Sequence, residues 1–248
     1  MAWALVRGMT KNQQHLLMKT RFFQPVRRGG RGNVTTLTIV MTFIVVLGLA
    51  LESVSGNGGG QGLAHALEVL KAGSAAEKLK ALELLARLGE MPVMPALVQA
   101  LRDGDERVRA AAQSTMWAIW LRSGDDEIEA LMAEGIHRME LEQYAEAIEI
   151  FDQIIARAPK FAEGYNKRAT VYYLTQEFEK SMADIQRTLE LNPVHFGALS
   201  GMGLCYLGLN EPRKALEWFE RAVAVNPNLD SIQHYIERIR AFLKDQTF

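Results

Sequence analysis

The chain has 248 residues, of which 48% are hydrophobic and 23% charged, so it is long enough for one or two domains with packed cores. Residues 1–34 hold seven of the 28 Lys and Arg residues and no acid, which leaves 21 bases against 29 acids from Glu52 onward. An acidic body argues against a nucleic-acid-binding protein, because phosphates are neutralised by clustered Lys and Arg.

Residues 1–33 form a basic leader, and residues 34–51 follow as an uncharged apolar run. As a helix, this run would be roughly 27 Å long, close to the ~30 Å hydrocarbon core of a bilayer. We therefore expect a transmembrane or signal helix behind a targeting leader. Arg-rich, acid-poor leaders are typical of organelle targeting. Residues 1–34 contain no serine, which favours a mitochondrial over a plastid or thylakoid destination.

Three interpretations of this region remain open. The first is an organellar presequence followed by a single-pass membrane anchor or a second, cleavable signal. Gly48 and Ala50 provide a small-x-small pattern that a signal peptidase would cut. The second is a secretory signal anchor with a long basic leader. The third is a buried core helix, which rarely lies between a basic tail and a glycine-rich segment. For an anchor, the positive-inside rule places residues 52–248 across the membrane.

Residues 52–62 are expected to be a Gly-rich linker, and residues 63–124 are expected to be helical. Leucines recur at helical spacing on either side of a break at Gly73–Ser74. A further helix starts near Pro95, and after a turn at Asp103–Asp105 another runs to Trp120.

This pattern resembles HEAT-type repeats, which implies stacked helix pairs. We call residues 63–124 the HEAT-like segment. We expect it to pack on the first helix pair that follows, with Trp117 and Trp120 in the core of the junction.

Residues 126–227 repeat with a period of 34 residues, and each column of the repeat has a consistent chemical type. Small residues that let two helices approach closely recur at Gly135, Ala169 and Gly203. Small residues of the second helix recur at Ala147, Ser181 and Ala215. Larger apolar residues recur at Phe151, Ile185 and Phe219, and helix-ending prolines at Pro159, Pro193 and Pro227.

At these columns the sequence resembles the tetratricopeptide repeat (TPR) family over three full repeats. The resemblance implies an all-α, right-handed α-solenoid of helix pairs, here preceded by the HEAT-like segment and an N-terminal apolar helix. Residues 228–248 continue as an amphipathic helix that is expected to cap the open end of the solenoid.

In the tetratricopeptide register, the first helix of each pair lines a concave groove. The groove residues predicted to bind a partner come from all three repeats: Met132, Ile136, Met139, Asn166, Lys167, Thr170, Tyr173, Ser200, Leu204 and Leu207. Apolar anchors of a bound helix or extended segment would contact the Met, Ile, Tyr and Leu side chains. Asn166 and Lys167 would fix its orientation, and Leu204→Glu would abolish capture without unfolding the solenoid.

The tetratricopeptide subclass that binds the acidic C-terminus of heat-shock chaperones carries Lys, Asn and Arg on this face in all three repeats. Here only Asn166 and Lys167 have that chemistry, since Met132 and Gly197 are among the residues that replace it. The pattern therefore argues against a carboxylate clamp.

No catalytic constellation, metal site, cofactor or small-molecule substrate is predicted. The five histidines do not share a metal-ligand spacing, and the glycines at 56–62 lack the Lys and Ser or Thr of a nucleotide loop. Cys205 lies ten residues after His195, which leaves a thiol enzyme as a remote alternative.

The sequence as a whole predicts a non-enzymatic protein-interaction scaffold that assists assembly or stability of an organelle membrane complex. Its partner would be a protein or peptide segment, and the membrane would be contacted through residues 34–51 if these are uncleaved. The alternative is a soluble co-chaperone-like adaptor released by cleavage of the leader.

Overall fold

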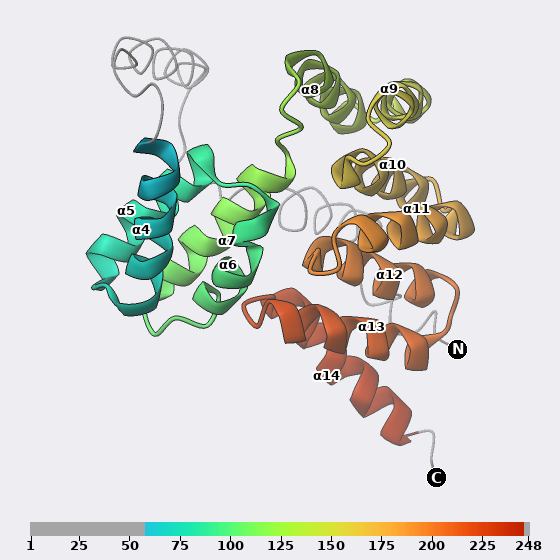
Figure 1. Cartoon of the computed structure of the whole chain (residues 1–248). Coiled ribbons are helices and arrows are strands. Elements are labelled where there is room, and N and C mark those ends of the chain that lie inside the picture. The colour runs from blue at the N-terminus through green and yellow to red at the C-terminus, as the bar shows by residue number, and fades with distance from the viewer. Residues whose placement is uncertain (1–57, 246–248) are drawn as a thin grey trace, which may run out of the picture.

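The computed structural model describes residues 58–245, and this part of the chain is all-helical (Figure 1). The leader and the apolar run at 34–51 lie outside the described residues, so the predictions about them stay predictions. Between residues 58 and 245, no helix is both long and apolar enough to cross a bilayer.

The HEAT-like segment consists of α4 (Gly58–Ala72), α5 (Ala75–Leu88), a 3₁₀ turn η1 (Met91–Val93), α6 (Met94–Ala100) and α7 (Glu106–Trp120). A capping box starts α5: the Ser74 hydroxyl accepts from the N–H of Glu77, and the Glu77 carboxylate accepts from the Ser74 N–H at 2.8 Å. Helix α4 begins at Gly58, inside the stretch 52–62 that its glycines predict as a linker. Leu63 and Leu67 pack into the core from this helix, and that packing outweighs the low helix propensity of glycine.

Three helix pairs and a final helix follow. They are α8 (Asp126–Glu140) with α9 (Tyr144–Arg157), α10 (Ala162–Leu174) with α11 (Phe178–Leu191), α12 (Phe196–Gly208) with α13 (Pro212–Val225), and α14 (Asp230–Asp245). The 34-residue period recurs in the backbone, because the turn within each pair contains a left-handed residue: Glu142, Gln176 and Asn210, with φ of 62°, 65° and 63°.

Close approach of the two helices in a pair explains the glycine columns. A Cβ built on Gly135 would lie 2.6 Å from the Phe151 ring, and one on Gly203 would lie 2.5 Å from the Phe219 ring. Both rings are fully buried. The all-α solenoid of helix pairs predicted from these columns is confirmed.

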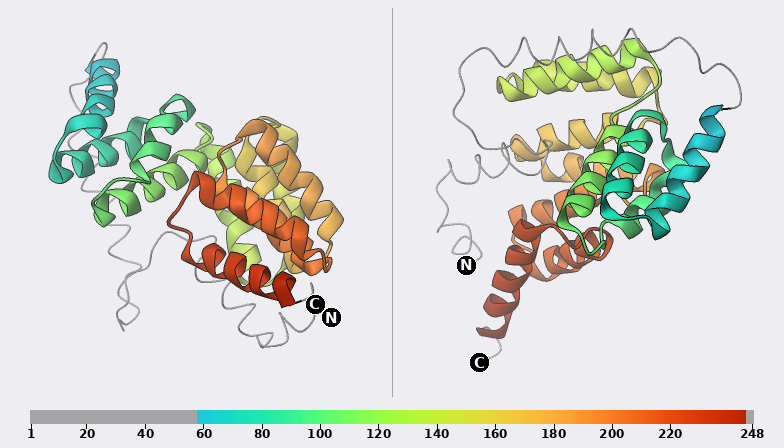
Figure 2. Two further views of the ribbon diagram at one scale, coloured as in Figure 1. Left: turned by 90° about the horizontal axis from the view of Figure 1, so that it is seen from below. Right: turned by 90° about the vertical axis from the view of Figure 1, so that its left-hand side faces the viewer.

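The pairs stack one after another along the right of Figure 1, from α8 and α9 to α12 and α13, with α14 at the end. The predicted capping helix buries Ile232, Ile236 and Ile239 against the solenoid. The HEAT-like segment forms a lobe beside the stack, as Figure 1 and the left view of Figure 2 show.

The lobe packs mainly on the third repeat, so the expectation that it packs on the first helix pair is wrong. Phe196, at the start of α12, belongs to the core of the HEAT-like segment. Arg109 Nε donates to Asn228 Oδ1 at 3.0 Å, and Asn226 Nδ2 donates to Gln113 Oε1 at 2.7 Å. The physical reason is that α12 has a glycine where α7 approaches it. A Cβ on Gly197 would lie 2.9 Å from the Trp117 ring.

Candidate protein-interaction surface

The first helices α8, α10 and α12 present equivalent residues in three columns along their shared face. The column nearest their starts is closed, since Met132, Asn166 and Ser200 are 3%, 2% and 1% exposed. The middle column is largely buried as well, with Ile136 partly exposed and Thr170 and Leu204 buried. The column nearest their ends is partly exposed in all three repeats: Met139, Tyr173 and Leu207.

A buried polar network explains the closed column in the second repeat. The carboxylate of Glu163 is fully buried and contacts Lys167 Nζ at 3.1 Å, Asn166 Nδ2 at 3.0 Å and His195 Nε2 at 2.9 Å. His195 Nδ1 accepts from the N–H of Ala198 at 3.0 Å, so Nε2 carries the proton and donates to Glu163.

The carboxylate of Glu163 and the ammonium of Lys167 neutralise each other within this network. Burial alone would raise the pKa of Glu163, but the Lys167 ammonium and the hydrogen bonds from His195 and Asn166 outweigh it and lower the pKa to about 2. Glu163 is therefore ionised at neutral pH. Asn166 and Lys167 are both 2% exposed and bind this carboxylate, so their side chains are not open to a partner in this structure, contrary to the role expected from the sequence.

Two tryptophans of α7 cover the network. The sequence placed them in a junction with the first helix pair, whereas they contact the second and third repeats. The Trp120 ring stacks on His195, with centroids 4.3 Å apart, and Trp117 meets Phe196 edge-on at 5.5 Å. Lys167 Nζ lies 5.7 Å from the centre of the Trp117 ring. We call the buried start of this face the covered half. It holds Met132 in the first repeat and Glu163, Asn166, Lys167, Gly197 and Ser200 in the other two. Lys167 and Gly197 lie near Trp117 of α7.

Leu204 belongs to the core instead of the groove. It is 7% exposed and shares a hydrophobic cluster with Ile232 and Ile236 of the terminal helix α14. A glutamate at this position would place a carboxylate among packed apolar side chains. This burial argues against the expectation that Leu204→Glu leaves the solenoid intact.

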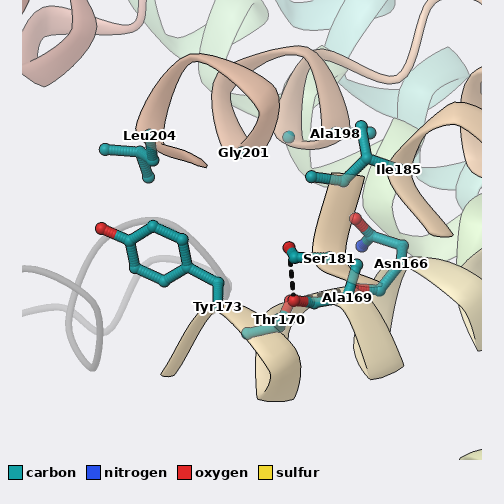
Figure 3. A pocket seen from close by; sticks show the side chains of 10 residues that line it. Asn166, Ala169, Thr170, Tyr173, Ser181, Ile185, Ala198, Gly201 and Leu204 are labelled. Carbon is teal, nitrogen blue, oxygen red and sulfur yellow. Dashed lines mark hydrogen bonds between the residues drawn. The ribbon is translucent and has the colours of Figure 1, made fainter. Parts of the chain in front are cut away.

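The remaining accessible residues form what we call the open strip: Ile136, Met139, Tyr173 and Leu207. A cavity of about 20 Å³ lies beside it between α10, α11 and α12, bounded by Tyr173 and Leu204 (Figure 3). Inside, the Ser181 hydroxyl donates to the carbonyl of Ala169 at 2.8 Å. The space matches one water molecule or the tip of a small side chain.

Burial raises the pKa of Tyr173 above its ordinary value, and the neighbouring Tyr235 and Cys205 add to the shift. Its hydroxyl therefore stays protonated across the physiological range and can both donate and accept a hydrogen bond. The open strip thus offers three aliphatic or thioether side chains and one neutral phenol.

Comparison with known proteins agrees with this architecture. Family models described as tetratricopeptide repeat match residues 132–193 and 197–229. The chain carries a tetratricopeptide-repeat domain. The matched residues fall on the three helix pairs from α8 to α13.

Two curated relatives show the extent of the similarity. The chain is 31% identical over 129 residues to a TPR repeat-containing protein of Rhizobium etli, which covers 52% of this chain and 63% of that protein. It is 27% identical over 110 residues to the Hsp70-Hsp90 organizing protein of Triticum aestivum, which covers 43% of this chain and 19% of that protein. The chain thus spans less than two thirds of the length of each relative.

Two solved structures are similar to parts of the chain. The first TPR of Spaghetti (RPAP3) bound to the HSP90 peptide SRMEEVD has a TM-score of 0.46 and 21% identity, covering 48% of this chain and 94% of that one. The MamA protein has a TM-score of 0.43 and 17% identity, covering 73% of this chain and 81% of that one.

The cysteine of the third tetratricopeptide repeat is a packing residue. Cys205 is fully buried, its Sγ donates to the Ser181 hydroxyl at 3.3 Å, and burial raises its pKa to about 11. His195 is bound to Glu163 instead. The two side chains therefore do not form a nucleophile–base pair. In the part of the chain that the structure describes, no group of three or more His, Cys, Asp or Glu side chains is arranged to hold a metal ion.

The structure also brings together residues that the sequence did not link to one another. A cleft between the HEAT-like segment and the first two repeats is lined by Trp120 and Asn192, among others. The repeat pattern gave no signal for it, because its two walls come from segments that only the tertiary packing brings together.

Proposed function

We propose that this protein is a non-enzymatic adaptor whose tetratricopeptide domain holds an apolar segment of a partner protein on the open strip. The observation that carries the proposal is the exposure of Met139, Tyr173 and Leu207, one equivalent residue from each repeat. A row of apolar side chains with one polar hydroxyl suits a helix or extended segment with regularly spaced apolar anchors. Met139 adapts to irregular anchor shapes because its side chain is unbranched and flexible.

The geometry does not favour capture of an acidic C-terminus. Relatives of this chain include Hsp70-Hsp90 organizing proteins, and one similar domain is described as bound to the HSP90 peptide SRMEEVD. In this chain, the groove residues with suitable chemistry, Asn166 and Lys167, already bind Glu163 beneath Trp117. An apolar partner segment is therefore the better match to the surface that remains accessible.

The proposed setting is an organelle membrane, with mitochondrial targeting favoured, where the adaptor assists assembly or stability of a membrane complex. The basic leader at 1–33 and the apolar run at 34–51 support this setting. The runner-up is a soluble co-chaperone-like adaptor released by cleavage near residue 50. Fractionation of cells that express the chain with a C-terminal tag, followed by amino-terminal sequencing of the mature protein, separates the two. Carbonate-resistant membrane association with residues 34–51 retained supports the anchor.

Capture of partners by the whole chain tests the binding surface. The tagged chain is immobilised in detergent and exposed to solubilised organelle membranes, alongside Leu207→Glu. The matched control is Leu88→Glu, which makes the same change at a leucine that is 47% exposed on α5, outside the strip. We expect a discrete partner to be retained by the unmodified chain and by the control but lost by Leu207→Glu. Equal retention by all three would place the binding surface elsewhere.

A further inference from the structure

The cleft between the HEAT-like segment and the first two repeats has a volume of about 510 Å³. This is within the range of about 300–1,000 Å³ that is usual for ligand sites. Its walls come from η1, the end of α7, the start of α8, the α9–α10 turn and the end of α11. The apolar residues among them are chiefly Met91, Ile119, Trp120, Ile128, Phe161 and Leu191. The cleft shares no residue with the open strip.

Unpaired polar atoms distinguish this cleft from an ordinary packing gap. Three buried side-chain atoms lack a hydrogen-bond partner within residues 58–245: Trp120 Nε1, Asn192 Nδ2 and Asn192 Oδ1. Both residues line the cleft, and Asn192 is only 1% exposed. Buried polar groups in native proteins are normally paired. The cleft therefore concentrates two donors and one acceptor that the described fold does not use.

The next repeat shows what satisfies an asparagine at this position. Asn226 lies 34 residues after Asn192, and its Nδ2 donates to Gln113 Oε1 at 2.7 Å, while its Oδ1 accepts from the Asn228 N–H at 3.0 Å. The unpaired carboxamide of Asn192 is thus not a general property of the position. Asn226 has an acceptor on α7 and a donor in the turn that follows it. Asn192 has neither an acceptor for its Nδ2 nor a donor for its Oδ1.

The chemistry of the missing partner follows from these atoms. An anion would pair with Nδ2 and leave Oδ1 unsatisfied, and a cation would do the reverse. A peptide group carries both a carbonyl acceptor and an N–H donor, so it satisfies both atoms. In a helical ligand these groups are already bonded to one another, which leaves an extended segment as the match.

The rim of the cleft supports an uncharged ligand. Its charged residues carry both signs: Asp125 and Glu127, and Arg122, Arg157 and Lys160. Arg157 pairs with Glu127 at 3.3 Å, and Arg122 Nη1 donates to the carbonyl of Gly89 at 2.8 Å. We propose that the cleft is a second binding site, which takes an extended, uncharged peptide segment of a partner protein. Its main-chain amide pairs with Asn192, and an apolar side chain lies beside Trp120 and Ile128.

The test uses the whole chain in detergent and a fluorescent library of hexapeptides with acetylated and amidated ends. Each peptide contains one central Leu, Phe or Trp among Gly, Ala and Ser. We expect saturable binding to the unmodified chain and about tenfold or more weaker binding to Asn192→Leu and Asn192→Asp. Asn192→Leu is expected to keep or raise the melting temperature, because it removes unpaired buried atoms, which separates a binding role from a structural one. Leu88→Glu, at an exposed leucine outside both the cleft and the open strip, is expected to leave peptide affinity unchanged.

A scan with N-methylated peptide bonds tests main-chain recognition. Methylation at one position is expected to weaken binding to the unmodified chain about tenfold and to have little further effect on Asn192→Leu. Three results would overturn the proposal: no saturable binding by any library peptide, equal affinity for Asn192→Leu, or insensitivity to methylation at every position. Cross-linking that places residues 1–57 of the same chain in the cleft would also overturn it.

Discussion

The covered half and the open strip lie on the same three helices, yet they have opposite relations to solvent. In the covered half, Glu163 and Lys167 form a buried ion pair under two tryptophans. About two to three turns further along, Tyr173 and Leu207 remain partly exposed. Residues with the chemistry of a peptide-binding groove are therefore not all accessible to a partner. Here the polar residues Glu163 and Lys167 lie buried near α7, and only some of the apolar residues, among them Tyr173 and Leu207, stay accessible.

The sharpest way to test this division compares two leucines of α12 that are three residues apart. Leu204 is buried against α14, whereas Leu207 is partly exposed. Leu204→Glu is expected to reduce the free energy of unfolding by about 4 kcal/mol or more, because it combines lost packing with a buried charge. Leu207→Glu is expected to cost under about 1 kcal/mol. Urea denaturation of both variants measures this, and equal costs would show that the two halves are not distinct.

Removal of the central carboxylate tests how the covered half is held together. Glu163→Ala leaves the ammonium of Lys167 buried without its partner, which is expected to cost about 3–4 kcal/mol in the free energy of unfolding. Lys167→Met in the same background is expected to recover part of the loss, because it removes the uncompensated charge. Denaturation of the single and double variants gives the coupling between the two residues. Additive losses would contradict a buried pair.

The acid dependence of stability follows from the same carboxylate. Its pKa is about 2 in the folded protein and near 4.5 when exposed. Because the folded value is the lower one, the stabilisation is complete above pH 4.5 and is lost as the pH falls toward 2. Each unit of difference between the folded and unfolded pKa values corresponds to roughly 1.4 kcal/mol of unfolding free energy. The difference in unfolding free energy between the unmodified chain and Glu163→Gln is therefore expected to shrink from pH 6 to pH 3; a constant difference would argue against ionised Glu163.

The tryptophans of α7 that cover the network are expected to contribute less to the free energy of unfolding than the buried ion pair. Trp117→Ala removes the edge contacts with Phe196 and the ring next to Lys167, at a cost of about 2–3 kcal/mol since Trp117 is only partly buried. Amide hydrogen exchange at the starts of α10 and α12 is expected to accelerate, whereas exchange at their ends is expected to stay the same. Uniform acceleration along both helices would mean that α7 supports the whole solenoid instead of one half.

The repeat fold was predictable because its determinants are local and periodic. The columns of Gly135 and Phe151 specify how one helix contacts the next, and the prolines specify where each pair ends. Docking of the HEAT-like segment was not predictable in this way. It depends on contacts such as Arg109 with Asn228 and Gln113 with Asn226, which are 119 and 113 residues apart and follow no period.

The candidate site was predictable only as a face of the solenoid. Periodicity identified the residues that point away from the second helices, and it found Met139, Tyr173 and Leu207 among them. It could not show that α7 covers Lys167 or that α14 covers Leu204. The same limit applies to Asn192, whose unpaired carboxamide is visible only once the neighbouring elements are in place.

Two methionines of α8 provide the most direct test of the division between the halves. Met132 is 3% exposed, whereas Met139 is partly exposed on the open strip. Oxidation by dilute peroxide, followed by mass spectrometry, measures the access to each thioether with and without a captured partner. The account predicts that Met139 is oxidised several times faster than Met132 and becomes protected when the partner binds. Equal rates, or protection of Met132 alone, would contradict it.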